Sequence, residues 1–135
     1  MSCRAHVKMA SVNFKAPPRG ATPKDSVLTF SDCSYRKGSS FAGLGAAAAE
    51  WGQYMTDAGS KAGIWHWYPV YGGGDEDFDF KWIEAHASLA DMGKDFDDYG
   101  NGRGFETAGK LFSHMIDCDS SRVYAAKSRR YVQLR

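Results

Sequence analysis

The sequence lacks the long apolar runs, cysteine pairs and nucleotide-binding loops that define several large classes of protein. None of its 135 residues fall in a run of roughly 18 to 20 apolar residues, the length of a membrane-spanning helix. It has no C-x-x-C, P-loop or G-x-S-x-G motif, which argues against common zinc or redox sites, nucleoside triphosphatases and serine hydrolases. Its first residues lack the apolar core of a secretory signal, so we expect a cytoplasmic protein with no membrane partner.

Cysteine is scarce as well. The three cysteines, Cys3, Cys33 and Cys118, cannot all pair within one chain, and their spacing does not mark them as metal ligands. We therefore expect free and mostly buried thiols. No other motif indicates a metal or an attached group, so we expect a protein without metal or cofactor.

The formal net charge of +1 hides an uneven distribution. Residues 1–25 carry five bases and one acid (+4), residues 26–121 carry seven and fifteen (−8), and residues 122–135 carry five and none (+5). We interpret residues 1–25 as a basic N-terminal arm, 26–126 as the folded domain and 127–135 as a basic tail. The sequence lacks the strand signature that reads RNA, so we expect no specific nucleic-acid partner.

Hydrophobic periodicity predicts an α+β domain. Alternating or aromatic-rich runs predict four strands, over residues 26–33, 63–71, 78–86 and 122–126. Helical spacing predicts three helices, over residues 44–58, 88–99 and 105–115, with Ser88 as the cap of the second. The order β, α, β, β, α, α, β matches a ferredoxin-like split βαβ fold with a four-stranded antiparallel sheet.

The second and third predicted strands flank a glycine-rich acidic loop and predict a β-hairpin. If Tyr71 lies opposite Phe78, then Trp67 lies opposite Trp82, and the aromatic side chains gather on one face. Both faces of the sheet are then largely apolar, whereas the helices can cover only one. We expect the other face to pack against a second copy of the chain in a homodimer.

Four segments of the sequence resemble recurring stretches of an uncharacterised bacterial branch of the dimeric α+β barrel superfamily. They are residues 68–72, 77–81, 99–102 and 118–124, and the resemblance covers about residues 26–126. It implies that ferredoxin-like sheets pair across a two-fold axis into a dimeric barrel. Some members of the superfamily are cofactor-independent oxygenases or cyclases, others bind or degrade haem, and their ligands lie between sheet and helices.

The hairpin also carries the candidate site. His66 can exchange a proton near neutral pH, with Tyr68 or Lys81 stabilising a developing oxyanion, so these three are the catalytic candidates. The ligand-binding candidates are Trp65, Trp67, Trp82 and His86.

Two functions stay open at this stage. The first is binding of a small apolar or aromatic molecule between sheet and helices, with or without cofactor-independent oxygenase or cyclase activity. The second is a non-catalytic homodimeric structural or interaction module, in which His66 is a hydrogen-bonded residue of the dimer interface. A cavity that reaches His66 would favour the first.

Overall fold

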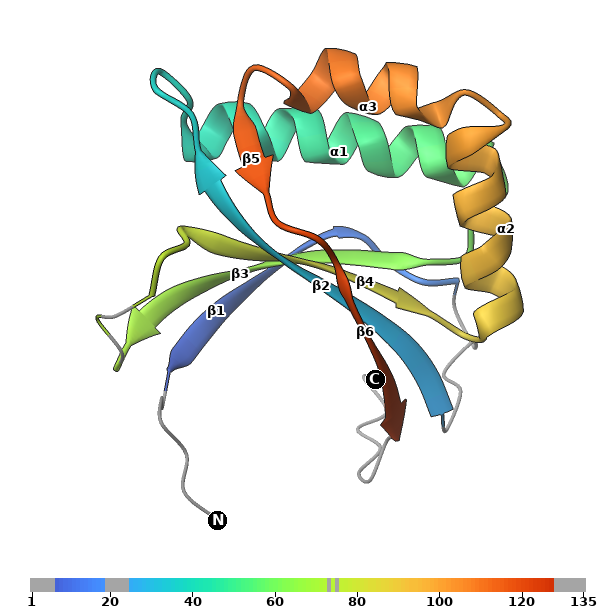
Figure 1. Ribbon diagram of the computed structural model, residues 1–135, viewed down its shortest axis with the longest axis horizontal. Helices are drawn as coiled ribbons and strands as arrows, with labels where there is room; N and C mark the ends of the chain where they lie inside the picture. The colour runs from blue at the N-terminus through green and yellow to red at the C-terminus, as the bar shows by residue number, and fades with distance from the viewer. Residues whose placement is uncertain (1–6, 19–24, 73, 75, 128–135) are drawn as a thin grey trace.

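The computed structural model describes residues 7–18, 25–72, 74 and 76–127, which form an antiparallel sheet with three helices on one face (Figure 1). The strands are β1 (Lys8–Lys15), β2 (Asp25–Tyr35), β3 (Gly63–Tyr71), β4 (Phe80–His86), β5 (Ile116–Cys118) and β6 (Arg122–Lys127). The helices are α1 (Phe41–Asp57), α2 (Leu89–Gly100) and α3 (Gly104–Phe112). The strand order is β1-β3-β4-β2-β5, and β6 also pairs with β2.

The prediction of an α+β protein is confirmed, but the prediction of a four-stranded ferredoxin-like sheet is wrong, because the sheet has six strands. The first additional strand, β1, lies within residues 1–25, the predicted arm, and pairs with β3 from end to end. The second, β5, has three residues, which is too short to give a periodic pattern. The described part of the basic N-terminal segment is therefore part of the sheet, whereas residues 128–135 of the predicted tail lie outside the described residues.

Serine side chains cap two of the helices, and Ser88 of α2 is the cap that the sequence predicts. Ser40 Oγ accepts a hydrogen bond from the Gly43 N–H, and Ser88 Oγ accepts one from the Asp91 N–H, both at 3.1 Å. The helical spacing of apolar residues in α1 predicts one buried face, and this prediction is confirmed. Five of these apolar side chains are buried: Leu44, Ala47, Ala48, Trp51 and Met55. Among the described residues, none of the helices is both long and apolar enough to cross a membrane.

The β3–β4 hairpin is shifted by one residue from the predicted register. Trp67 lies opposite Lys81, and His66 lies opposite Trp82. Because side chains alternate between the faces of a sheet, Trp67 and Trp82 lie on opposite faces. The prediction of a single face that gathers the aromatic side chains of the hairpin is therefore wrong.

Burial beneath the helices explains this register. Ile64, His66 and Phe80 are each 0 % exposed, and Ile64 packs with Trp51 and Met55 of α1. Phe80 packs in a second cluster, with Leu44 of α1. The register of the hairpin is therefore set by the apolar surface that it buries beneath the helices, and clustering of aromatic residues constrains it less.

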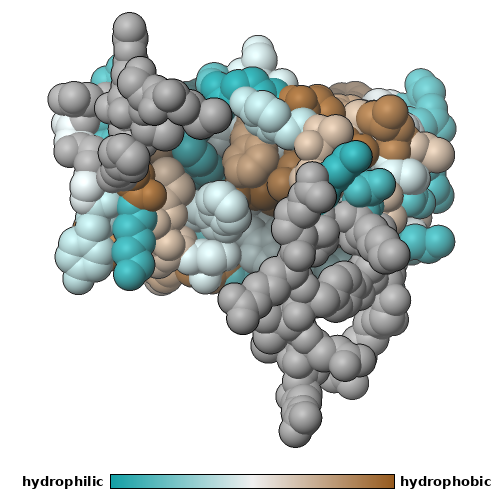
Figure 2. Space-filling view, turned by 90° about the horizontal axis from the view of Figure 1, so that it is seen from below, coloured by the Kyte–Doolittle hydropathy of each residue, from teal (hydrophilic) through white to brown (hydrophobic). Residues whose placement is uncertain are grey.

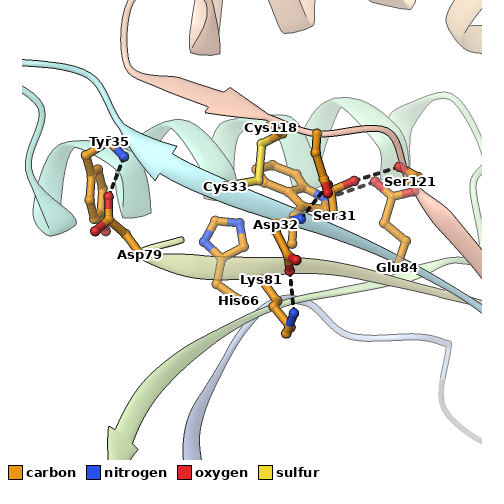
Figure 3. The surroundings of a disulfide bond; sticks show 12 residues. Ser31, Asp32, Cys33, Tyr35, His66, Asp79, Lys81, Glu84, Cys118 and Ser121 are labelled. Carbon is orange, nitrogen blue, oxygen red and sulfur yellow. Dashed lines mark hydrogen bonds and ion pairs between the residues drawn. A yellow bond between two sulfur atoms is a disulfide. The ribbon is translucent and has the colours of Figure 1, made fainter. Parts of the chain in front are cut away.

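Cys33 and Cys118 form a disulfide between β2 and β5 (Figure 3). The two residues are direct cross-strand partners with their Cα atoms 4.1 Å apart, so the prediction of free thiols is wrong for this pair. Cys3 lies outside the described residues. Disulfides are rare in the cytosol, so this bond gives no support to the predicted cytoplasmic location. That location stays a prediction.

We expect this disulfide to contribute to stability, because it joins positions 85 residues apart and restricts the unfolded chain. The double variant Cys33→Ala/Cys118→Ala should lower the free energy of unfolding in urea by about 2–4 kcal/mol relative to the oxidised protein. Reduction of the natural protein should shift the urea midpoint in the same direction. Equal midpoints for the oxidised protein, the reduced protein and the variant would contradict the assignment.

Candidate functional site

A cavity of about 400 Å³ lies between the sheet and the three helices, and we call it the helix-side cavity. Its sheet side is formed by β2, β4 and β5, and its walls come from α1, α2 and α3. Most of its lining is apolar, with six aromatic side chains: Trp51, Trp82, Phe96, Tyr99, Phe105 and Phe112. Phe96, Tyr99 and Phe105 are 58 %, 43 % and 47 % exposed, so they form a hydrophobic rim that is open to solvent.

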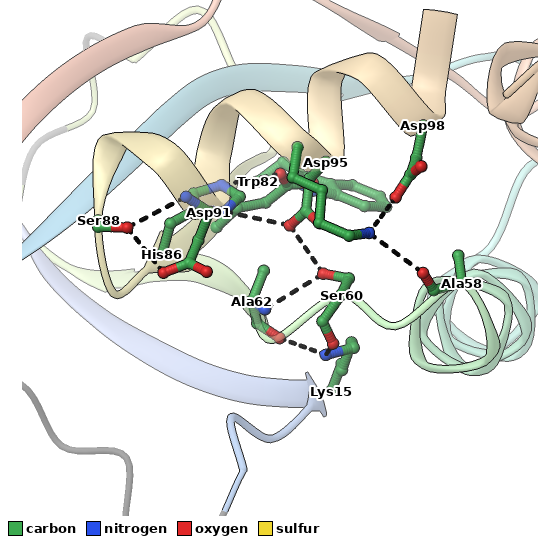
Figure 4. A network of polar contacts seen from close by, with 12 residues as sticks. Lys15, Ala58, Ser60, Ala62, Trp82, His86, Ser88, Asp91, Asp95 and Asp98 are labelled. Atoms are coloured by element: carbon green, nitrogen blue, oxygen red, sulfur yellow. Dashed lines mark hydrogen bonds and ion pairs between the residues drawn. The ribbon is translucent and has the colours of Figure 1, made fainter. Parts of the chain in front are cut away.

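Two acids and a histidine line the same cavity: Glu84 and His86 at the end of β4, and Asp95 within α2. His86 lies between the two acids, with Nδ1 3.3 Å from Asp95 Oδ2 and Nε2 3.7 Å from Glu84 Oε2 (Figure 4). The imidazole is buried, and neither ring nitrogen has a hydrogen-bond partner among the described residues. Such a buried polar group is normally satisfied, so an unpartnered one at a cavity wall indicates a place for a ligand group.

The acids themselves are oriented by neighbouring donors. Trp82 Nε1 donates to Glu84 Oε1 at 3.1 Å, and Ser60 Oγ donates to Asp95 Oδ2 at 2.7 Å. The remaining oxygens, Glu84 Oε2 and Asp95 Oδ1, have no hydrogen bond within the described part of the chain. Each carboxylate is therefore fixed by one oxygen and keeps the other for a ligand or for water.

Lys15 supports this group from the end of β1 without lining the cavity. Its buried ammonium donates to the carbonyl oxygens of Ser60 and Ala62 at 3.0 and 2.5 Å (Figure 4). Burial lowers the pKa of Lys15, and the charges of Asp95 and Glu84 oppose that effect. Lys15 thus holds the loop that carries Ser60, and through Ser60 it holds the Asp95 carboxylate.

Two of the predicted catalytic residues, His66 and Tyr68, lie on the helix side of the sheet but away from the helix-side cavity. His66 is 0 % exposed, and its Nδ1 lies 3.2 Å from the Tyr68 hydroxyl. Rings of Phe14, Phe80 and Trp82 surround it, with centroids 4.4 to 4.8 Å away. Burial lowers the pKa of His66 to about 3 and also raises that of Tyr68, so His66 is a neutral core residue near pH 7.

The third predicted catalytic residue, Lys81, lies on the opposite, helix-free face, which we call the open face. Figure 3 shows His66 and Lys81 pointing away from each other across the sheet. Lys81 forms an ion pair with Asp32, which also lies 3.1 Å from Arg122 Nη2. The three predicted catalytic side chains therefore do not meet in one site.

The predicted ligand-binding residues divide in the same way. Trp82 and His86 line the helix-side cavity, whereas Trp67 lines a hollow of about 710 Å³ on the open face. Trp65 shares the face of Trp67, because the two alternate with His66 along β3. In Figure 2, which looks onto the open face, hydrophobic side chains lie among hydrophilic ones in this hollow.

Of Glu84, His86 and Asp95, only His86 was predicted from the sequence as part of the site. A local signal for Asp95 exists, because it follows Met92 by three residues and precedes Tyr99 by four. This spacing puts the acid on the predicted apolar face of α2, where a charge needs a partner. The meeting of Asp95 with His86 depends on how α2 packs against β4, which no local spacing predicts.

Comparisons with protein-family models, curated proteins and solved structures gave no match. The resemblance to dimeric α+β barrels therefore stays a prediction, and the function must be argued from the site itself. In the described residues, no three His, Cys, Asp or Glu side chains converge as metal ligands.

Proposed function

We propose that the protein binds a small molecule with an apolar or aromatic body in the helix-side cavity and exchanges a proton with it through His86. The observation that supports this most is the buried imidazole of His86, which lines the cavity with both ring nitrogens unpartnered in the described residues. Leaving such a polar group unsatisfied costs about 1–3 kcal/mol. A bound ligand that hydrogen-bonds to the ring removes this cost.

The surroundings of His86 suit a proton acceptor. Glu84 and Asp95 face the two ring nitrogens from opposite ends of the imidazole, and carboxylates in such positions orient the ring of a general base. The imidazole is buried beside mostly apolar walls, where electrostatic interactions are stronger than in water. A general base in this position accelerates proton removal from a bound substrate, and cofactor-independent oxygenases and cyclases are among the activities that the resemblance implies.

We expect a larger side chain at Gly109 to block the cavity. Gly109 lines the cavity on α3, and a Cβ built there meets no atom within 4 Å, so Gly109→Leu extends into open space. The neutral fluorophore N-phenyl-1-naphthylamine should bind the natural protein saturably and the variant about tenfold more weakly or less.

Gly93→Leu is the matched control, because Gly93 is also helical, also has no atom within 4 Å of a built Cβ, and does not line the cavity. Its affinity for the fluorophore should equal that of the natural protein. Saturable binding that both leucine variants retain unchanged, or no binding to the natural protein, would contradict the proposal.

A second candidate function is a non-catalytic homodimer that assembles through the open face. Phe30, Trp67 and Tyr124 form an edge-to-face aromatic chain on that face, with centroids 5.6 and 5.7 Å apart. Lys81 and Asp32 place both charge signs beside it, so two copies related by a two-fold axis can be complementary.

For this candidate we expect the natural protein to be a dimer by light scattering at micromolar concentration. Trp67→Glu should be a monomer, because burial of a charge in an apolar interface is unfavourable. Leu89→Glu changes a 66 % exposed residue of α2 and should stay dimeric. A monomeric natural protein would exclude the homodimer and leave the ligand-binding proposal unchanged.

A further inference from the structure

The charges and aromatic rings of the helix-side cavity indicate what kind of molecule it takes, an inference that rests on the proposed function. The lining residues include the acids Glu84 and Asp95 but neither lysine nor arginine. Lys15, whose charge interacts with those of both acids although it does not line the cavity, gives hydrogen bonds to two backbone carbonyls and none to the acids. An anionic ligand would therefore face two carboxylates with no compensating cation at the cavity wall.

The helix above the cavity adds to this negative field. Besides Asp95, which is already counted in the cavity wall, α2 carries three aspartates and one lysine within Leu89–Gly100, a further sum of −2. Lys94 is already paired with Asp98, on the outer surface of the helix. A positively charged group that enters the cavity is therefore attracted by both the cavity wall and the helix.

The aromatic side chains favour the same ligand charge. Trp51, Trp82 and Phe112 pack edge to face, with Phe112 5.1 Å from Trp82 and 6.4 Å from Trp51 between ring centroids. The faces of aromatic rings are negative, and an organic cation within about 6 Å of a ring centroid is attracted to them. Aromatic walls combined with carboxylates are the chemistry that recognises ammonium groups on apolar molecules.

We propose that the ligand is an amphipathic amine, with its aromatic or aliphatic body against the ring walls and its ammonium group at one of the two carboxylates beside the His86 ring. The ammonium N–H groups donate to Glu84 Oε2 or to Asp95 Oδ1, the two carboxylate oxygens without hydrogen bonds in the described residues. A ring nitrogen of His86 forms a further hydrogen bond with the ligand, which satisfies a buried group that otherwise has no hydrogen-bond partner in the described residues.

Three probes that share a naphthalene ring test this inference by calorimetry near neutral pH: 2-naphthylmethylamine, 2-naphthylmethanol and 2-naphthoate. They differ in charge, being cationic, neutral and anionic. The amine should bind about tenfold or more tightly than the alcohol, and the carboxylate should bind most weakly. In Glu84→Gln/Asp95→Asn, the preference for the amine should fall below about threefold while the affinity for the alcohol is kept.

Glu50→Gln/Asp57→Asn is the control, because it removes the same number of charges from exposed positions of α1 outside the cavity and should leave the ranking unchanged. If the alcohol or carboxylate binds as tightly as the amine, or if the amine preference survives in the cavity variant, this inference is wrong and small-molecule binding stands. If none of the three probes binds and N-phenyl-1-naphthylamine does not bind either, both proposals fail. The ranking in the natural protein decides the question even if the cavity variant does not fold.

Discussion

The position of β4 between β2 and β3 determines which chemistry the protein can perform. In the observed register, Trp82, Glu84 and His86 face the helices, and Lys81 faces the other way. A slip of one residue would exchange these two sets and place a lysine beneath the helices instead of a histidine and a glutamate. The register of β4 therefore determines which side chains line the helix-side cavity, including Glu84 and His86. It also places the predicted catalytic residue Lys81 on the open face, away from His66.

Packing around the cavity keeps its polar group in place. Lys15 at the end of β1 binds the carbonyls of the loop before β3, Ser60 in that loop binds Asp95, and Asp95 faces His86. Strand β1 thereby connects the basic N-terminal segment with the site, although the two lie far apart in sequence. The acids keep free oxygens because they are held from one side only, and this leaves a preorganised arrangement for a ligand.

The sequence alone allowed prediction of the features that depend on neighbouring residues. The cap at Ser88 and the buried face of α1 follow from local spacing, as do strands β2, β3, β4 and β6 within a few residues. Features that join distant segments were not predictable in this way. The Cys33–Cys118 disulfide spans 85 residues, and the meeting of Asp95 with His86 depends on helix packing. The register was mispredicted because aromatic content was weighted above the buried surface that the helices require.

The central claim is that His86 contacts a ligand in the helix-side cavity, whereas His66 is a sealed core residue. Long-range proton–nitrogen NMR of the histidine rings during titration with 2-naphthylmethylamine tests this directly. We predict that the ring nitrogen signals of His86 shift saturably, that those of His66 stay fixed, and that His66 is neutral, in line with its lowered pKa of about 3. A ligand-dependent shift at His66 with none at His86 would contradict the account.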